Sequence, residues 1–163
     1  MRGKNHDGHH HIRELIEKGV CHFVVEELPE SEYDECNFLI VPDSLKALQQ
    51  LAAAVRSKFA GPVVAITGSN GKTVVKEWLW QVLNSQLAVC RSPKSYNSQV
   101  GVPLSVWELG SQHQLAVFEA GISQPGEMEH LADILRPQYG IFTNIGTAHQ
   151  EGFENATNKI VEN

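Results

Sequence analysis

Apolar residues follow two alternating patterns along most of the chain: short continuous runs, and longer stretches in which they recur every three or four positions. A short run bounded by turn residues is typical of a buried strand, and the longer spacing is typical of a helix with one apolar face. Beyond residue 60, the runs predict strands at 63–67, 87–90, 115–119 and 139–142. The stretches between them predict helices at 73–84, 102–109 and 127–135. Strands that alternate with helices predict an α/β fold, in which a parallel sheet carries helices on both faces.

The first 60 residues carry shorter and more polar segments, which predict part of a small α/β domain. Expected here are a helix at 12–18, strands at 22–25 and 38–41, and an acidic loop at 28–37. A longer helix is expected between the turn Pro42-Asp43-Ser44, which offers an N-cap, and Gly61-Pro62. This helix is expected to connect two units, because a new strand begins directly after it. The expected boundaries are therefore 1–42 for the small domain, 43–60 for the connecting helix and 61–163 for the larger domain.

One of these helices carries a notable set of large apolar residues. Within 73–84, an apolar stripe is formed by Val75, Trp78, Leu79, Val82 and Leu83. A stripe at this spacing normally faces the core of a domain. The tryptophans of this helix are therefore expected in the core, and not as surfaces on which a ligand stacks.

The N-terminal stretch 1–11 contains four of the eight histidines of the chain. Three interpretations are open: the remnant of a purification tag, a metal-binding tract, or an ordinary loop. A tag normally has an unbroken run of histidines, whereas Asp7-Gly8 interrupts this one. Metal binding by a short histidine-rich tract is a compositional argument only. The loop is the favoured interpretation.

Composition narrows the class of protein. The 13 Lys and Arg against 19 Asp and Glu leave a formal net charge of −6, which argues against a general nucleic-acid surface but not against local binding of one nucleotide. Cys21, Cys36 and Cys90 form no spaced pair, as expected for reduced thiols in a cytoplasmic protein. No apolar run approaches the roughly 20 residues of a membrane span, and the polar N-terminus is unlike a secretory signal.

The strongest chemical signal is the stretch 63–73, V-V-A-I-T-G-S-N-G-K-T. A buried strand, a glycine-rich turn and the start of a helix follow one another, which is the arrangement of a phosphate-binding loop. Its expected phosphate contacts are Gly68, Ser69, Asn70, Gly71, Lys72 and Thr73. In such a loop the lysine reaches the outer phosphates and the hydroxyl after it holds Mg²⁺. Ile66 stands where the full motif has its first glycine, so a coincidental turn is the competing interpretation.

Further polar residues follow the other predicted strands, and parallel strands bring their carboxyl ends to one rim of the sheet. This rule gathers Thr73, Asn97, Glu119, Asn144 and His149. Glu119 ends an apolar strand, where an unpaired carboxylate would be costly. A Mg²⁺ shared with Thr73 would compensate it, and an ion pair with a surface lysine is the alternative. For His149 taken by itself, three roles are open: metal ligand, phosphate contact and structural histidine. The structural role is the most common one for a single histidine.

Five segments together resemble the ATP site of the Mur ligases of peptidoglycan synthesis. They are I-T-G-S-N-G-K-T at 66–73, Y-N-S-Q-V-G-V-P-L at 96–104, V-F-E-A-G at 117–121, G-E at 126–127 and T-N-I-G-T-A-H at 143–149. The order and spacing of all five are more specific than any one of them. The second and last segments are most similar to the branch of the family that adds D-alanyl-D-alanine to UDP-N-acetylmuramoyl-tripeptide. Residues 74–78, V-V-K-E-W, are similar to forms fused to an alanine racemase.

The resemblance implies an ATP- and Mg²⁺-dependent carboxylate–amine ligase in the cytoplasm, which works through an acyl phosphate. It implies the following roles: phosphate contact by Lys72, Mg²⁺ binding by Thr73, Glu119 and His149, and lining of the site by Asn97 and Asn144. Lys72, Glu119 and His149 would be the catalytic residues. Residues 2–41 are similar to the second half of the family's UDP-binding domain, and 61–163 to the first part of its central ATPase domain.

The sequence also departs from the family. Ser98 stands where a second asparagine is usual. The family's carbamylated lysine would fall at or just beyond Asn163, and no suitable lysine is present there. The start of the UDP-binding domain and the C-terminal domain have no counterpart. We therefore expect a fragment that binds nucleotide weakly and does not ligate.

Three rival functions are open at this stage. They are a free-standing P-loop ATPase or small-molecule kinase, another Mur-type or folylpolyglutamate-type ligase, and a folded fragment without enzymatic activity. An ATPase or kinase would need an acceptor-activating base and an arginine-bearing lid, for which no clear candidate is present.

Overall fold

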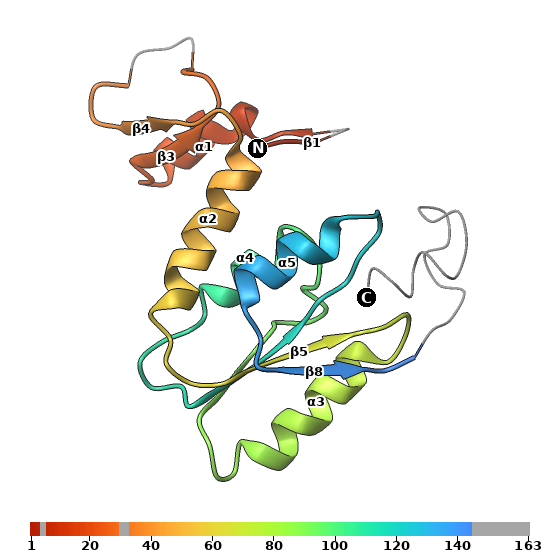
Figure 1. Cartoon of the computed structure of the whole chain (residues 1–163). Helices are drawn as coiled ribbons and strands as arrows, with labels where there is room; N and C mark the ends of the chain where they lie inside the picture. The colour runs from red at the N-terminus through yellow and green to blue at the C-terminus, as the bar shows by residue number, and fades with distance from the viewer. Residues whose placement is uncertain (4–5, 30–32, 145–163) are drawn as a thin grey trace. The chain divides into compact units, whose positions relative to one another are not determined.

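The computed structural model describes residues 1–3, 6–29 and 33–144, and Figure 1 traces the chain. The chain divides into two compact units, Met1–Leu48 and Gln49–Asn163. Within the described ranges, every helix is too short or too polar to cross a membrane.

The first unit is built around two short parallel strands. Strand β3 (His22–Val25) pairs in parallel with β4 (Asn37–Ile40), and helix α1 (Ile12–Glu17) precedes them. Phe23 and Phe38 are neighbours in this register, and their rings stack with centroids 5.3 Å apart. The predicted helix and strands of this unit are thus confirmed, with β4 beginning one position earlier.

The histidine-rich N-terminus is more ordered than a loop. Strands β1 (Arg2–Gly3) and β2 (His6–Asp7) form an antiparallel pair, and a 3-10 helix, η1 (Gly8–His11), follows. The carboxylate of Asp7 caps η1 by accepting from the backbone N–H of His9 at 3.0 Å and lies 2.5 Å from Nδ1 of His9. Nε2 of His9 accepts from the backbone N–H of Glu26 at 3.2 Å. His9 therefore joins two segments of the unit, which the loop interpretation did not foresee.

The second unit is a four-stranded parallel sheet, as predicted. Strands β5 (Val63–Thr67), β6 (Val89–Arg91), β7 (Leu115–Glu119) and β8 (Tyr139–Phe142) lie in the order β6-β7-β5-β8, and all three pairings are parallel. Strands β5 and β7 are central, and every residue of β7 is buried. Because the strands are parallel, the loops after β5, β6, β7 and β8 reach the same edge of the sheet.

Helices cover both faces of this sheet (Figure 1). Helix α3 (Lys72–Leu83) lies on one face, and α4 (Gly101–Val106) and α5 (Glu127–Leu135) lie on the other. Helix α2 (Ser44–Ser57) begins after Asp43, whose carboxylate accepts from the N–H of Lys46 at 2.9 Å, and its later residue Ala52 is buried with α4 and α5. The predicted fold class is confirmed.

The apolar stripe predicted for α3 is confirmed for three of its five residues and wrong for the other two. Val75, Leu79 and Leu83 pack on the sheet, together with Trp80. Trp78 and Val82 are 65% and 70% exposed, so Trp78 is not a core residue. The reason lies in Lys76, which takes a fully buried position on the packed side of the helix.

Candidate functional site

The loop between β5 and α3 has a backbone that only glycine adopts readily. Gly68 has a φ of +124° and Gly71 a φ of +83°. Gly71 is the N-cap of α3 and, as a glycine, has no side chain that could cap the helix. The ammonium of Lys72 donates to the backbone oxygen of Gly68 at 2.6 Å and closes the loop. N–H groups at a helix start beside a lysine make an anion-binding site.

The two residues that follow β8 hold this loop in place. Asn144 accepts from the N–H of Ser69 through its backbone oxygen at 2.8 Å, and from the N–H of Asn70 through its side-chain oxygen at 3.0 Å. The hydroxyl of Thr143 lies 3.1 Å from the backbone oxygen of Thr67 and 2.6 Å from that of Asn70, and donates its one proton to either of them. The structure therefore brings Asn144 to the loop, where its side chain sets the loop's shape.

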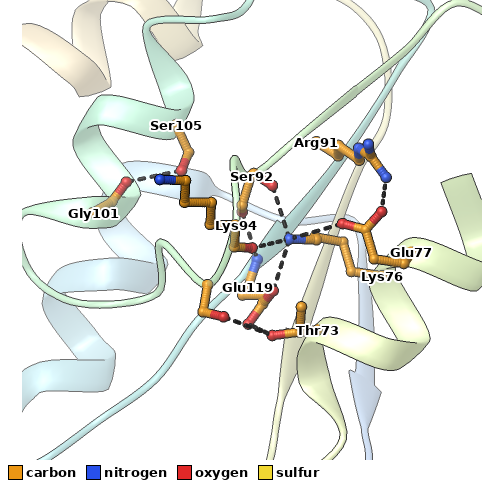
Figure 2. A network of polar contacts seen from close by, with 10 residues as sticks. Thr73, Lys76, Glu77, Arg91, Ser92, Lys94, Gly101, Ser105 and Glu119 are labelled. Carbon is orange, nitrogen blue, oxygen red and sulfur yellow. Dashed lines mark hydrogen bonds and ion pairs between the residues drawn. The ribbon is translucent and has the colours of Figure 1, made fainter.

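Glu119, at the end of β7, is 0% exposed and lies beside the loop (Figure 2). Its Oε2 accepts from the hydroxyl of Thr73 at 3.0 Å, and its own N–H donates to the hydroxyl of Ser92 at 3.0 Å. The Thr73 hydroxyl has one proton, which it gives to Glu119, so Ser95 Oγ, 3.1 Å away, donates to Thr73. The predicted meeting of Thr73 and Glu119 at one rim is thus observed.

The partner of Glu119 is a lysine that the sequence analysis missed. Nζ of Lys76 lies 2.9 Å from Oε1 of Glu119, and both side chains are 0% exposed. The same ammonium donates to the backbone oxygens of Ser92, at 2.8 Å, and Lys94. The sequence analysis expected either a metal or a surface lysine as the partner of Glu119, whereas Lys76 is buried. The available signal was its position four residues after Lys72, next to Val75 on the packed side of α3.

A second carboxylate extends the network away from the loop. Oε1 of Glu77 lies 3.3 Å from Nζ of Lys76, and its other oxygen pairs with Arg91. The guanidinium of Arg91 in turn lies over the ring of Trp80, 3.8 Å from the centroid. Figure 2 shows the chain of contacts from Arg91 through Glu77 and Lys76 to Glu119 and Thr73.

A pocket adjoins the loop at the carboxyl ends of β5 and β7. It is lined by Gly68, Ser69, Lys72, Asn97, Ser98, Gln99, Gly121, Ile122, Ser123 and Glu127. Asn97 is held there because its backbone oxygen accepts from Gly121 at 2.8 Å, and a Cβ on Gly121 would lie 3.0 Å from Cγ of Asn97. The structure therefore places Asn97 and Lys72 in one pocket.

Glu127 is a pocket residue with an organising role that the sequence analysis did not assign. Its carboxylate accepts from the N–H groups of Ser123 and Gln124 at 2.6 and 3.0 Å and from the Ser123 hydroxyl at 3.0 Å. It thereby shapes the loop that follows β7. The predicted segment G-E at 126–127 was the available signal.

The chemistry of the rim fits a hard divalent cation. Oε1 of Glu119 is buried and, although it lies near Lys76, it has no directed hydrogen bond within the described ranges. It therefore keeps lone pairs for another cation, and a carboxylate with a threonine hydroxyl is an oxygen donor set that suits Mg²⁺. No group of three or more His, Cys, Asp or Glu side chains suited to a metal occurs among the described residues. His149, the third predicted ligand, lies outside them.

Comparison with known proteins supports the resemblance to the Mur ligases. Residues 66–162 match the family model of the Mur ligase middle domain. The UDP-N-acetylmuramoyl-tripeptide--D-alanyl-D-alanine ligase of Synechocystis sp. is 36% identical over 149 residues, 91% of this chain and 33% of the relative. The ligase of the same name from Treponema pallidum is 38% identical over 158 residues, 91% of this chain and 34% of the relative.

The solved structures that align with this chain are ligases of the same kind. A crystal structure of MurF from Acinetobacter baumannii aligns with a TM-score of 0.93 at 32% identity, over 99% of this chain and 35% of that one. The MurF ligase of Thermotoga maritima, crystallised in complex with ADP, aligns with a TM-score of 0.88 at 31% identity, over 99% and 37%. The chain thus spans about a third of the length of these relatives. Their names describe ligases alone, so the expected racemase fusion receives no support.

Proposed function

The chain belongs to the Mur ligase family through its middle domain, and on that premise we propose that it carries the nucleotide-binding core of a MurF-type ligase. The proposed reaction joins D-alanyl-D-alanine to UDP-N-acetylmuramoyl-tripeptide with consumption of ATP, in the cytoplasm. We assign 1–42 to part of a UDP-substrate domain, 43–60 to a connecting helix and 61–163 to the first part of the ATP-binding domain. One observation carries the proposal: a glycine loop with Lys72 lies beside Thr73, whose hydroxyl bonds to the buried Glu119.

The loop supports nucleotide binding by its charge and its backbone. The N-terminus of α3 is uncapped by a side chain, and its N–H groups favour an anion. Lys72, now on the Gly68 carbonyl at 2.6 Å, has an ammonium in the pocket lining that also contains Ser69 and Asn97. We assign phosphate binding to Gly68, Ser69, Asn70, Gly71, Lys72 and Thr73. Asn97 is assigned to the pocket wall, and Asn144 to the side of the site where it holds the loop.

Thr73 and Glu119 are the residues that would hold Mg²⁺ within the described ranges, and His149 is proposed as a third ligand from the family pattern alone. When bound, Mg²⁺ supplies charge neutralisation at the phosphate oxygens. The Thr73 hydroxyl and Oε2 of Glu119 are already 3.0 Å apart, so these two oxygens need little rearrangement to face one cation, while Oε1 faces Lys76.

In the proposed reaction, a carboxylate oxygen of the tripeptide bonds to the γ-phosphorus of ATP while the bond to ADP breaks. The amine of D-alanyl-D-alanine then bonds to the acyl carbon, phosphate leaves, and the amine loses a proton. Phosphoryl transfer depends on alignment and charge stabilisation more than on covalent help from the protein. Lys72 and the loop N–H groups supply that charge stabilisation, while Asn144 and Thr143 hold the loop that positions them.

Calorimetric titration of ADP and ATP, each with Mg²⁺, into the chain tests nucleotide binding. Lys72→Met should weaken binding roughly 10- to 100-fold, the loss expected for a hydrogen bond to a charged group. Lys58→Met, which removes an exposed lysine, is the control and should bind as the unmodified chain does. Absence of binding, or equal binding by Lys72→Met, contradicts the proposal.

The substrates are tested separately. Because this chain alone is expected not to ligate, the assay uses a longer protein that contains it. Formation of ADP together with an amide product from UDP-N-acetylmuramoyl-tripeptide and D-alanyl-D-alanine supports the specific ligase. ADP formation without any acceptor supports a plain ATPase, and product formation with a folate and glutamate supports the folylpolyglutamate-type alternative.

A further inference from the structure

The buried lysine of α3 has no part in the function proposed above, yet it is the closest charged neighbour of the proposed metal ligand. We propose that Lys76 is the positioning residue of Glu119: it is a built-in counter-ion that holds the carboxylate beside the phosphate-binding loop before a metal arrives. The proposal rests on the proposed metal site in one respect, namely that a divalent cation later takes over part of this charge compensation.

The first argument is the burial of both charges. Lys76 and Glu119 are each 0% exposed, and their charged atoms are 2.9 Å apart. Burying one charge without a partner is far more costly than burying a pair, because neither water nor a counter-ion then compensates it. In the described part of the chain, Glu119 has no second cation within ion-pair distance. Without Lys76, the carboxylate would have to move, be neutralised or bind another cation.

The second argument is the number of protons on the ammonium. A lysine ammonium has three protons, and four oxygens surround this one: the backbone oxygens of Ser92 and Lys94, Oε1 of Glu119 and Oε1 of Glu77. The two carbonyls receive directed hydrogen bonds, so one ammonium proton remains for Oε1 of Glu119 and Oε1 of Glu77. Because one proton cannot saturate the lone pairs of the Glu119 carboxylate, Lys76 compensates its charge and still leaves it able to take a metal.

The third argument is the loop that follows β6. Lys94 has a positive φ of +48°, unusual for a residue with a side chain, and its carbonyl accepts from Lys76. The next residue, Ser95, reaches Thr73 at 3.1 Å. One ammonium thus fixes both the carboxylate and the loop whose serine contacts the proposed ligand Thr73.

A double-mutant cycle in the metal-free chain tests the pairing, with thermal unfolding as the readout. Lys76→Met leaves Glu119 buried and uncompensated, and should lower the midpoint on the order of 10 °C. In a Glu119→Gln background the same substitution should have a much smaller effect, because no charge is left unpaired. Lys58→Met is the control for loss of an exposed lysine. Equal effects of Lys76→Met in both backgrounds overturn the proposal, since Lys76 would then act only on the Ser92 and Lys94 carbonyls.

Metal rescue is the second readout, with Mn²⁺ and ADP as the probe. The Mn²⁺-dependent rise of the unfolding midpoint should be larger in Lys76→Met than in the unmodified chain, because the metal then supplies the missing charge. An equal or smaller rise contradicts the proposal. If Lys76→Met does not fold without metal, the double variant Lys76→Met/Glu119→Gln should still fold, and its failure to do so also contradicts the proposal.

The two proposals can fail independently. If electron paramagnetic resonance shows no Mn²⁺ binding by the unmodified chain with ADP, the proposed metal site is wrong. The metal-free cycle then still decides whether Lys76 compensates Glu119.

Discussion

Replacing Gly68 by alanine should disrupt the loop more than the same change at any other glycine in it. Gly68 has a φ of +124°, which side-chain-bearing residues rarely adopt. A Cβ there would overlap the hydroxyl of Thr143 and lie 2.9 and 3.0 Å from the backbone oxygen and nitrogen of Asn144. The hydroxyl can rotate away, but the backbone of Asn144 cannot move without breaking its hydrogen bonds to Ser69 and Asn70.

Two effects add up in Gly68→Ala. The positive φ costs roughly 1–2 kcal/mol for a residue with a Cβ, and forcing a methyl group into a packed contact costs about 1–3 kcal/mol. The free energy of unfolding should therefore fall by about 2–5 kcal/mol, a large part of the roughly 5–15 kcal/mol that stabilises a typical domain.

Gly71→Ala is the matched control, because Gly71 also has a positive φ, of +83°, but its Cβ would find its nearest atom at 3.9 Å. Gly71→Ala should lower the free energy of unfolding only by the cost of the positive φ, about 1–2 kcal/mol. Urea unfolding of both variants separates the two effects, and ADP titration should show weaker binding in Gly68→Ala. If Gly68→Ala is no less stable than Gly71→Ala, the close approach of the loop to Asn144 does not exist in solution.

Three further predictions concern groups away from the loop. Arg56 is buried and donates to the carbonyls at the end of α5, so Arg56→Met should lower the free energy of unfolding by about 2–4 kcal/mol in urea titrations. Burial raises the pKa of Cys90 from 9.0 to about 11, which lowers the fraction of reactive thiolate roughly 100-fold. In alkylation kinetics Cys90 should therefore react roughly 100-fold more slowly than a thiol of ordinary pKa, and more slowly than the exposed Cys21. Hydrogen bonds from the side chain and the backbone of Ser44 lower the pKa of Glu26. The stability that they contribute should be present above the ordinary pKa of a glutamate and be lost as the pH falls through the lowered value. In Glu26→Gln, this pH-dependent part of the stability should be missing from acid unfolding curves.

The strands and their order of appearance were predictable because each is a continuous apolar run bounded by turn residues. The four strands of the sheet and the strand at 22–25 were located to within two residues, and parallel pairing followed from their alternation with helices. The gathering of Thr73, Glu119, Asn97 and Asn144 at one rim followed from that topology, because parallel strands end on the same side. The topology of the sheet was therefore sufficient to predict that these four residues lie at one rim.

The contacts inside the rim were not predictable in the same way. That Asn144 would accept from the N–H of Asn70 depends on the shape of a loop whose glycines have positive φ. The order of the N-terminus depends on Asp7 and on His9, whose second ring nitrogen bonds to a residue 17 positions away. Neither pattern is periodic, so hydrophobic spacing contains no signal for it.

Helix α3 shows why a helix is harder to orient than a strand. A strand has two faces, and apolar alternation or continuity decides between them, whereas a helix can rotate by small steps and still bury a plausible stripe. The predicted stripe of α3 placed Trp78 and Val82 in the core, yet both are exposed and the charged Lys76 is buried. The reversal becomes reasonable once Glu119 is considered, because a buried carboxylate at the end of β7 requires a cation from the element packed over it. A charged residue on the packed side of a helix therefore indicates a buried opposite charge on the sheet beneath, and here that charge is the proposed metal ligand.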